Sequence, residues 1–229
     1  IGYRRPQVRV TKVLDLDGDM DLKIEGALAR TIGRNNPLPG WYDSGEDSAE
    51  PSAQGRVSTT LSVFPNTPST TIGVSAHYGK EEWDPGNEEF RSWSLNVDVY
   101  QPIHSWLTIK GELFTGENLD AYMGGIGQGV TLFAPNQYDE VGSHGGWAAA
   151  TFGPWKSCSF NVGVAIDDVD RGDVNNGDRT LNRSEFANVF YPLGKNVDCA
   201  VELSRWRTDY SGPGDADSFR IQAAIIYKF

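Results

Sequence analysis

Hydrophobic and polar residues alternate along most of this chain, and the alternation is clearest at its end. In residues 218–229 (SFRIQAAIIYKF), apolar side chains occupy every second position and the last residue is aromatic. A period of two is that of an extended strand, whose successive side chains point to opposite faces. A strand of about 10 residues with one continuous apolar face is typical of a membrane β-barrel. This segment therefore predicts a membrane-spanning strand.

The same pattern repeats along the whole chain and predicts eleven strands. It is strongest at 93–100, 107–113 and 160–167, and it is weakest in the first strand and around 145–152, where the facing is less well defined. The expected strands are 7–16, 21–31, 54–65, 70–83, 90–103, 107–119, 142–154, 157–170, 179–193, 196–212 and 218–229.

Short and long connections alternate between these strands. Tight turns are expected at 16–20, 65–69, 102–106, 154–156 and 193–196, and longer polar loops at 32–53, 84–89, 120–141, 171–178 and 213–217. Outer-membrane barrels have this layout, with periplasmic turns and extracellular loops. The predicted fold is all-β, a transmembrane antiparallel up-and-down β-barrel. A soluble sandwich or lectin is the least favoured alternative, because it gives no reason for this rhythm.

The strand count predicts that residues 1–229 form a single barrel domain that is the C-terminal part of a longer chain. Single-chain bacterial barrels have an even number of strands and both termini in the periplasm. Eleven strands that end in the periplasm would begin outside the cell. We therefore expect at least one further strand upstream, and a total of about 16 for a general porin.

Two segments near the end resemble a known family. Residues 182–210 (NRSEFANVFYPLGKNVDCAVELSRWRTDY) are similar to the penultimate hairpin of Gram-negative trimeric porins, with the DcaP-like group among the candidates. The terminal strand resembles the assembly signal of outer-membrane barrels. The resemblance covers about the last fifty residues. It implies a bacterial outer-membrane channel, a homotrimer, and contact with membrane lipid and lipopolysaccharide.

Composition narrows the choice of partners. The net charge of −11 argues against a nucleic-acid partner, whose phosphates need clustered Lys and Arg. Hydrophobic residues make up only 38% of the chain, as expected where alternate residues face water. Cys158 and Cys199 fall on the eighth and tenth expected strands, too far apart for a disulfide. We expect two free thiols that face lipid.

The polar faces of the expected strands supply the candidate site. If the apolar residues face outward, an aqueous lumen receives charged residues of both signs, which would set up a transverse field that selects solutes by charge. The simpler alternative for each of them is a solvated wall residue. The predicted pore-lining residues are Lys23, Glu25, Asp98, Lys110, Glu112, Asp167, Asp198, Glu202 and Arg220.

Two loops are long enough to fold inward and narrow the pore. Loop 32–53 carries aromatic and acidic residues, Trp41, Tyr42, Asp43, Glu46, Asp47 and Glu50. Loop 120–141 contains the sequence GGIGQG, in which Gly124, Gly125, Gly127 and Gly129 do not match a phosphate-binding spacing. These glycines instead indicate a flexible loop with positive φ. Both loops remain candidates.

The remaining motifs give no cofactor, metal or catalytic residue. The acidic stretch 167–178 has closely spaced oxygen ligands, but it lacks the EF-hand order, so a plain acidic loop is favoured over a Ca²⁺ site. His77, His104 and His144 fall on different segments, and no hydrolase motif accompanies them.

The sequence therefore predicts an outer-membrane, porin-like channel for passive diffusion of small hydrophilic solutes, and not an enzyme. Two other barrels remain as alternatives. A structural anchor would have a lumen filled by side chains or loops. An outer-membrane hydrolase would need a Ser or Asp beside one of the histidines near the outer rim.

Overall fold

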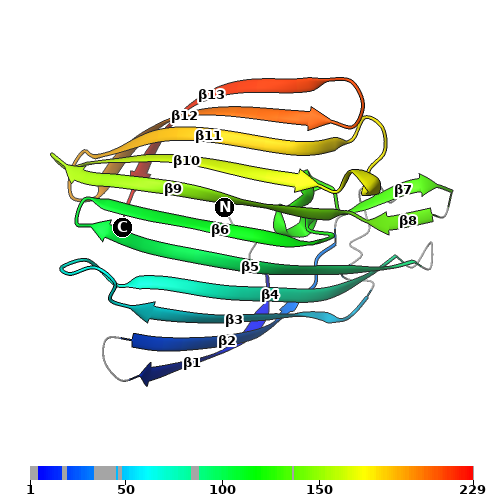
Figure 1. The fold of residues 1–229 in the computed structure, drawn as a ribbon, viewed down its shortest axis with the longest axis horizontal. Coiled ribbons are helices and arrows are strands. Elements are labelled where there is room, and N and C mark those ends of the chain that lie inside the picture. The colour runs from blue at the N-terminus through cyan, green and yellow to red at the C-terminus, as the bar shows by residue number, and fades with distance from the viewer. Residues whose placement is uncertain are drawn as a thin grey trace.

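The computed structural model of the chain is dominated by one curved antiparallel sheet (Figure 1). It describes residues 5–16, 20–33, 45, 48–83, 88–135 and 137–228. Neighbouring strands follow chain order, except that a small hairpin is inserted between β6 and β9. The eleven strands of the sheet are β1 (Gln7–Leu16), β2 (Met20–Arg30), β3 (Pro51–Leu61), β4 (Thr70–Trp83), β5 (Glu88–His104), β6 (Leu107–Glu117), β9 (Gly142–Trp155), β10 (Cys158–Val169), β11 (Arg179–Pro192), β12 (Val197–Tyr210) and β13 (Asp215–Tyr227).

These strands confirm the up-and-down architecture that the alternation predicts. Each of the eleven expected strands corresponds to one strand of the sheet, with ends that differ by a few residues. The clearest difference is at β3, which begins at Pro51 although the alternation starts only at 54. β1 and β13 form the two edges of the sheet among the described residues.

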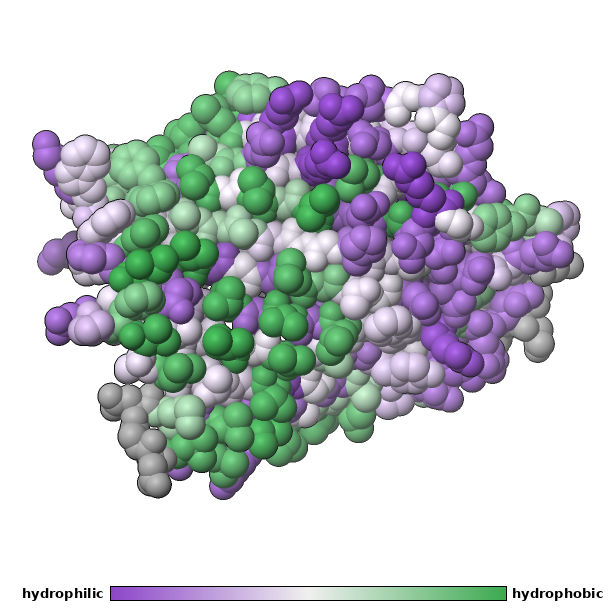
Figure 2. All heavy atoms as spheres, in the orientation of Figure 1, coloured by the Kyte–Doolittle hydropathy of each residue, from purple (hydrophilic) through white to green (hydrophobic). Residues whose placement is uncertain are grey.

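The register of strand pairing gives the sheet two chemically different faces. Val74 pairs with Val97, and Val97 pairs with Leu113, so one apolar row continues across three strands. Its side chains are exposed, and Val8 and Ile225 on the edge strands are 75% and 78% exposed. Figure 2 shows hydrophobic residues gathered in a belt on the visible face, over the half of the sheet that lies nearer the short turns. A contiguous exposed apolar belt of this kind is typical of a surface that faces lipid.

The part of the chain between β6 and β9 has more structure than a plain loop. It contains the short turns η1 (Asp120–Tyr122) and η2 (Gly125–Gly127) and a hairpin of β7 (Val130–Ala134) and β8 (Gln137–Glu140). The hairpin extends beyond the ends of the main strands (Figure 1). The predicted long connection over 120–141 is present, but it contains nine strand residues that were not predicted, because these two strands are too short to stand out as an alternation.

Two small apolar clusters hold this insertion against the sheet. Trp83, Phe90 and Val130 are buried together, and Tyr138 of the hairpin packs on them. The second cluster consists of Val141, Val169 and Val174 with Ile126 of η2 packed against it. A third short turn, η3 (Arg171–Asp173), lies in the loop after β10.

Part of the predicted loop 32–53 and the last residue of the chain lie outside the described residues. Residues 34–44 and 46–47, with Trp41, Tyr42, Asp43, Glu46 and Asp47, lie outside the described residues, and so does Phe229. Among the residues that are described, no helix has the length and apolar character needed to cross a membrane.

The two cysteines are free, as predicted. Cys199 on β12 pairs with Tyr191 of β11 and with Ile225 of β13, whose side chains belong to the exposed apolar face. Cys158 begins β10, at an irregularity in its pairing with β9.

We predict that both thiols react fully with a maleimide when the protein is unfolded without a reductant. β11 separates the strands that carry Cys158 and Cys199, and two strand spacings of about 9–10 Å exceed the roughly 7 Å Cα separation that a disulfide bridges. Peptide mass spectrometry should find both cysteines alkylated. A disulfide-linked pair of peptides would contradict the register.

Candidate functional site

The register places every predicted pore-lining residue on one face of the sheet. We call this the inner face, because residues 118–129 fold over it. Glu25 pairs with Arg56, and Asp98 pairs with Glu112, and paired side chains share a face. When the pairs are followed from strand to strand, all nine predicted residues lie on this inner face. They are Lys23, Glu25, Asp98, Lys110, Glu112, Asp167, Asp198, Glu202 and Arg220.

A chain of ion pairs runs across the inner face of β1–β5. Glu25 lies at its centre, with Lys23 at 3.0 Å, Arg56 at 3.7 Å and Arg9 at 3.9 Å. Arg56 also holds Asp98 through two hydrogen bonds, from Nη2 to Oδ2 at 2.6 Å and from Nε to Oδ1 at 3.1 Å. A two-pronged contact of this kind fixes the plane of the guanidinium as well as its position.

Gly73 makes the contact between Arg56 and Asp98 possible. The two residues lie on β3 and β5, and the position between them on β4 is Gly73, which pairs with Asp98. A Cβ at this position would come within 2.6 Å of Asp98 Oδ1 and would be closer still to the Arg56 guanidinium. The missing side chain therefore leaves the space in which Arg56 crosses an intervening strand.

One end of segment 118–129 is fixed to β4 and β5. The ring of Tyr122 stacks on His77 with centroids 3.9 Å apart, and the Arg5 guanidinium lies 4.1 Å from the Tyr122 ring centroid. His77 in turn hydrogen bonds to the Ser94 hydroxyl at 2.6 Å and to the Ser92 hydroxyl at 3.0 Å. Stacking and cation–π contact both favour this placement of Tyr122.

The other end of the segment is fixed to β10 and β11. The Ile126 N–H donates to Asp167 Oδ2 at 2.8 Å. The Gln128 side chain donates to the Arg179 carbonyl at 2.8 Å and accepts from the Arg179 N–H at 3.0 Å. Of the four glycines for which positive φ was predicted, Gly125 and Gly127 have it, at 62° and 69°, whereas Gly124 has φ of −95° and Gly129 is not in the positive-φ region. Ile126, between Gly125 and Gly127, has φ of 53°. The segment therefore lies over the inner face from β4 to β11.

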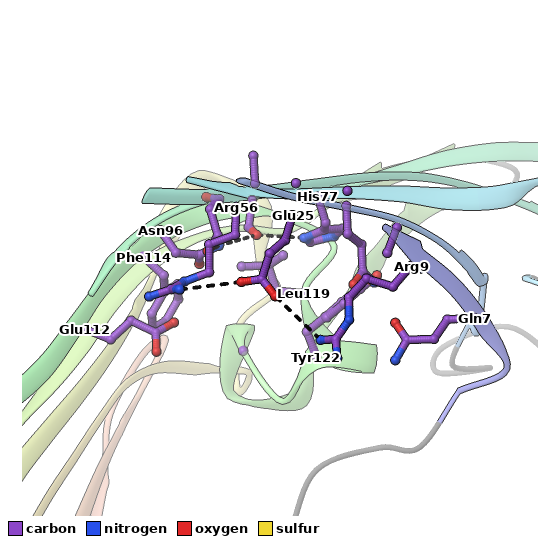
Figure 3. Close-up of a pocket in the computed structure, with 18 of the residues that line it drawn as sticks. Gln7, Arg9, Glu25, Arg56, His77, Asn96, Glu112, Phe114, Leu119 and Tyr122 are labelled. Carbon is purple, nitrogen blue, oxygen red and sulfur yellow. Dashed lines mark hydrogen bonds and ion pairs between the residues drawn. The ribbon is translucent and has the colours of Figure 1, made fainter. Parts of the chain in front are cut away.

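A cavity of about 440 Å³ lies between this segment and the inner face of β1–β6 (Figure 3). Arg9 and Gln7 lie at one end of the view and Glu112 at the other, with Glu25 and Arg56 between them. The polar and aromatic residues that line it include Gln7, Arg9, Glu25, Gln54, Arg56, Ser75, His77, Ser94, Asn96, Glu112, Phe114 and Tyr122.

The predicted residues fall into three groups. Glu25 and Glu112 line this cavity, and Lys23 and Asp98 are joined to it by ion pairs. Lys110 lies next to Glu112 on the same face of β6. The other four residues are not brought to the cavity, because Asp167 lies beneath the far end of the segment and Asp198, Glu202 and Arg220 lie on β12 and β13.

Glu202 ends a ladder of side-chain hydrogen bonds across the inner face of β9–β12. The Thr151 hydroxyl donates to Asn161 Oδ1 at 2.6 Å, Asn161 Nδ2 donates to Asn188 Oδ1 at 2.7 Å, and Asn188 Nδ2 donates to Glu202 Oε2 at 3.0 Å. Glu202 is one of the predicted residues, whereas Thr151, Asn161 and Asn188 were not predicted, although each alternates with apolar neighbours. The ladder gives this part of the inner face a hydrogen-bonded, polar surface.

Arg9 and Arg56 are the main residues that the sequence prediction missed. Their strands did carry a signal, because Val8 and Val10 flank Arg9 and Val57 follows Arg56. These valines are exposed on the outer face, so the arginines between them must face inward. The partners of each arginine depend on the register and could not be read from the alternation.

The acidic stretch and the histidines have local structural partners. Asp173 accepts from the Gly142 N–H at 2.9 Å, and Asp178 accepts from the Asn175 N–H at 2.8 Å, so both carboxylates shape the loop after β10. Within the described part of the chain, no group of three or more His, Cys, Asp or Glu residues is placed to hold a metal ion. His144 lies 4.0 Å from Asp168, and His104 lies beside Trp106.

We predict that Gly73→Ala destabilises the protein by about 1–3 kcal/mol, the usual range for an overpacked site. The added methyl group would separate Arg56 from Asp98. Gly26→Ala on β2 is the matched control, because a Cβ there meets no atom within 4 Å. Urea unfolding in lipid vesicles should show a lower midpoint for Gly73→Ala alone. Equal midpoints for the two variants would contradict the proposed role of Gly73.

Comparison with known proteins gives a structural match and no sequence match. No protein-family model matches the sequence, and neither does any curated protein. The outer-membrane channel DcaP of Acinetobacter baumannii superposes with a TM-score of 0.73 at 12% identity, over 98% of this chain and 62% of that one. An anion-selective porin from Comamonas acidovorans superposes with a TM-score of 0.61 at 10% identity, over 96% of this chain and 59% of that one.

These matches define the fold. The chain spans about three fifths of the length of each of these two structures. Over these residues its fold, an antiparallel up-and-down sheet of eleven strands, is that of the two barrel proteins, as the alternation predicts.

Proposed function

We propose that this chain is part of an outer-membrane channel through which small hydrophilic solutes diffuse passively. The observation that carries this proposal is the two-faced sheet, with an exposed apolar belt outside and a charged, hydrogen-bonded face inside. A wet, charged lumen lowers the free energy of a polar solute within a low-dielectric membrane. The known protein DcaP is described as an outer-membrane channel and the Comamonas protein as an anion-selective porin, which supports a channel role for the shared fold.

In this proposal, segment 118–129 forms the narrow part of the pore. It is fixed at both ends, by Tyr122 on His77 and by Ile126 on Asp167, and it leaves a cavity rather than a filled space over β1–β6. The nine predicted residues are proposed to line the lumen, with Arg9 and Arg56 added to them. We assign a pore-narrowing role to loop 120–141 because its anchored part lies over the inner face.

Each histidine has the Ser or Asp neighbour that the hydrolase alternative needs: His104 bonds to Ser105 at 3.1 Å and His144 lies 4.0 Å from Asp168. The shortest of these contacts is the hydrogen bond between His77 and Ser94 at 2.6 Å. The surroundings of this pair favour an anchoring role. Tyr122 covers the His77 ring, and the second ring nitrogen bonds to Ser92 rather than to a carboxylate. A general base needs access to a substrate and an orienting partner for its second nitrogen. We therefore assign the pair to holding Tyr122 in place.

We predict stepwise conductance of nanosiemens order when the full-length protein is reconstituted in planar bilayers. Tyr122→Ala should raise the single-channel conductance, because it removes the ring that joins the segment to His77 and Arg5. Phe133→Ala, on the exposed hairpin of the same loop, is the control and should leave the conductance unchanged. A correctly inserted but silent barrel would reject the channel and favour a structural anchor.

The same proposal includes contact with lipopolysaccharide at the outer face of β11–β13. Here charged residues interrupt the apolar belt, since Glu185 pairs with Val164 and Arg205 pairs with Phe219. Arg205 contacts Asp217 at 3.0 Å, and Arg207 contacts Asp209 and Asp215 at 3.1 and 2.7 Å. Charges on a lipid-facing wall cost least where headgroups begin. The side chains of Arg205 and Arg207 are 60% and 49% exposed, so their ion pairs are weak and either arginine can exchange its carboxylate for a phosphate of an outer leaflet. A homotrimer is also proposed, from the resemblance to trimeric porins.

We predict that Arg205→Gln weakens the binding of lipopolysaccharide to the detergent-folded protein. The loss of one exposed charge contact should reduce affinity about two- to fivefold. Lys110→Gln, which removes one positive charge from the inner face, should leave the affinity unchanged. Lipid binding can be followed by native mass spectrometry. Equal losses in both variants would indicate an effect of net charge and would contradict a site on this face.

A further inference from the structure

The charges that line the cavity divide into satisfied and available groups. Glu25 has three cationic neighbours, and its side chain is only 12% exposed. Arg56 is held by Asp98 and Glu25, and the side chains of Arg56 and Asp98 are each 29% exposed. Together with Lys23, which lies 3.0 Å from Glu25, these three groups carry two charges of each sign and have little remaining capacity to bind a charged solute.

Two lining residues keep a charge available to a solute. Arg9 is 58% exposed, and the one ion pair that it makes with another described residue, Glu25, is long at 3.9 Å. Glu112 lines the cavity and has no ion pair within the part of the chain that the structure describes. Figure 3 shows them on opposite sides of the Glu25–Arg56 pair. The cavity therefore offers a free positive charge at one end and a free negative charge at the other.

The space between these two charges is suited to a peptide backbone. Gln54, Ser75 and Asn96 line the same cavity and supply amide and hydroxyl groups, while Phe114 and Tyr122 add aromatic surface. A pocket with a few convergent polar groups among apolar walls is the usual form of a small-molecule site.

We propose that the cavity binds short zwitterionic peptides in transit, with the carboxylate towards Arg9 and the ammonium group towards Glu112. The proposal rests on the channel function proposed above and names one solute class for it. Arg9 and Glu112 lie on β1 and β6, five strand spacings apart in the sheet, so we expect an α-amino acid, whose two charged groups share one carbon, to be too short to reach both. A peptide of about three residues extends about 10 Å at 3.3–3.6 Å per residue, which allows its ends to lie on either side of the Glu25–Arg56 pair.

Three peptides of nearly equal size test this proposal directly. Trialanine carries both charges, N-acetyl-trialanine carries only the negative one, and trialanine amide carries only the positive one. Dissociation constants are measured by NMR titration of each peptide with the full-length protein folded in detergent at low salt. Trialanine should bind about two- to fivefold more tightly than either singly charged peptide, the range for one exposed ion pair. The preference should shrink at high salt, where exposed charges are screened.

Two variants assign each end of the peptide. Arg9→Gln should remove the preference for trialanine over its amide and leave the preference over the acetylated peptide. Glu112→Gln should do the reverse. Lys12→Gln is the matched control, since Lys12 pairs with Ile24 on the outer face of β1 and should leave both preferences intact.

The outcomes separate this site from the channel function. Equal affinities for the three peptides would overturn the site, and so would preferences that survive both variants. Because binding is measured without a membrane, a protein that shows the expected preferences but conducts no ions would reject the channel and retain the peptide site. A conducting protein without the preferences would reject the site alone.

Discussion

The pairing register of the antiparallel strands is the constraint on which the rest of this structure depends. Directly paired residues have their side chains on the same face of the sheet. Once the inward-pointing side chains of one strand are known, the register therefore determines those of all eleven strands. A slip of one residue at any pair would move an apolar row inward and a charged row outward. The pairing of Glu25 with Arg56 and of Val74 with Val97 shows both rows in the native register. The apolar belt, the ion pairs and the cavity all follow from this alignment.

The segment over the inner face depends on the same alignment, because its two anchors lie on strands far apart in the sheet. His77 on β4 and Asp167 on β10 face the same side only in this register. Ile126 adopts a left-handed conformation that costs a β-branched residue about 1–2 kcal/mol. Its N–H bond to Asp167 and its packing against the cluster of Val141, Val169 and Val174 offset that cost. The segment is thus held in one position by specific contacts. The glycines beside Ile126 allow the positive φ angles of the turn, and they do not make the segment mobile.

Most of the fold could be predicted from the sequence, because period-two alternation is a local property of each strand. Each strand shows it within about ten residues, and the nine predicted charges reached one face because alternation alone decides facing. The anchors of segment 118–129 are different, since Ile126 and Asp167 are 41 residues apart and Arg5 and Ala121 are 116 apart. Contacts over such distances are set by tertiary packing, and the hairpin β7–β8 likewise depends on a cluster with Trp83 and Phe90.

The chain of ion pairs on β1–β5 shows why the net charge of a pore protein does not by itself determine its charge selectivity. The chain has a net charge of −11, yet a solute near the cavity meets mainly groups whose charge is not already neutralised by a neighbour. Coulomb interactions with a closely paired Glu25 or Asp98 largely cancel at a distance, because the cation beside each carries the opposite sign. Arg9 and Glu112 keep their fields because their pairing is weak or absent among the described residues. Selectivity in such a lumen is therefore set by the arrangement of unpaired charges, and composition alone is a poor guide to it.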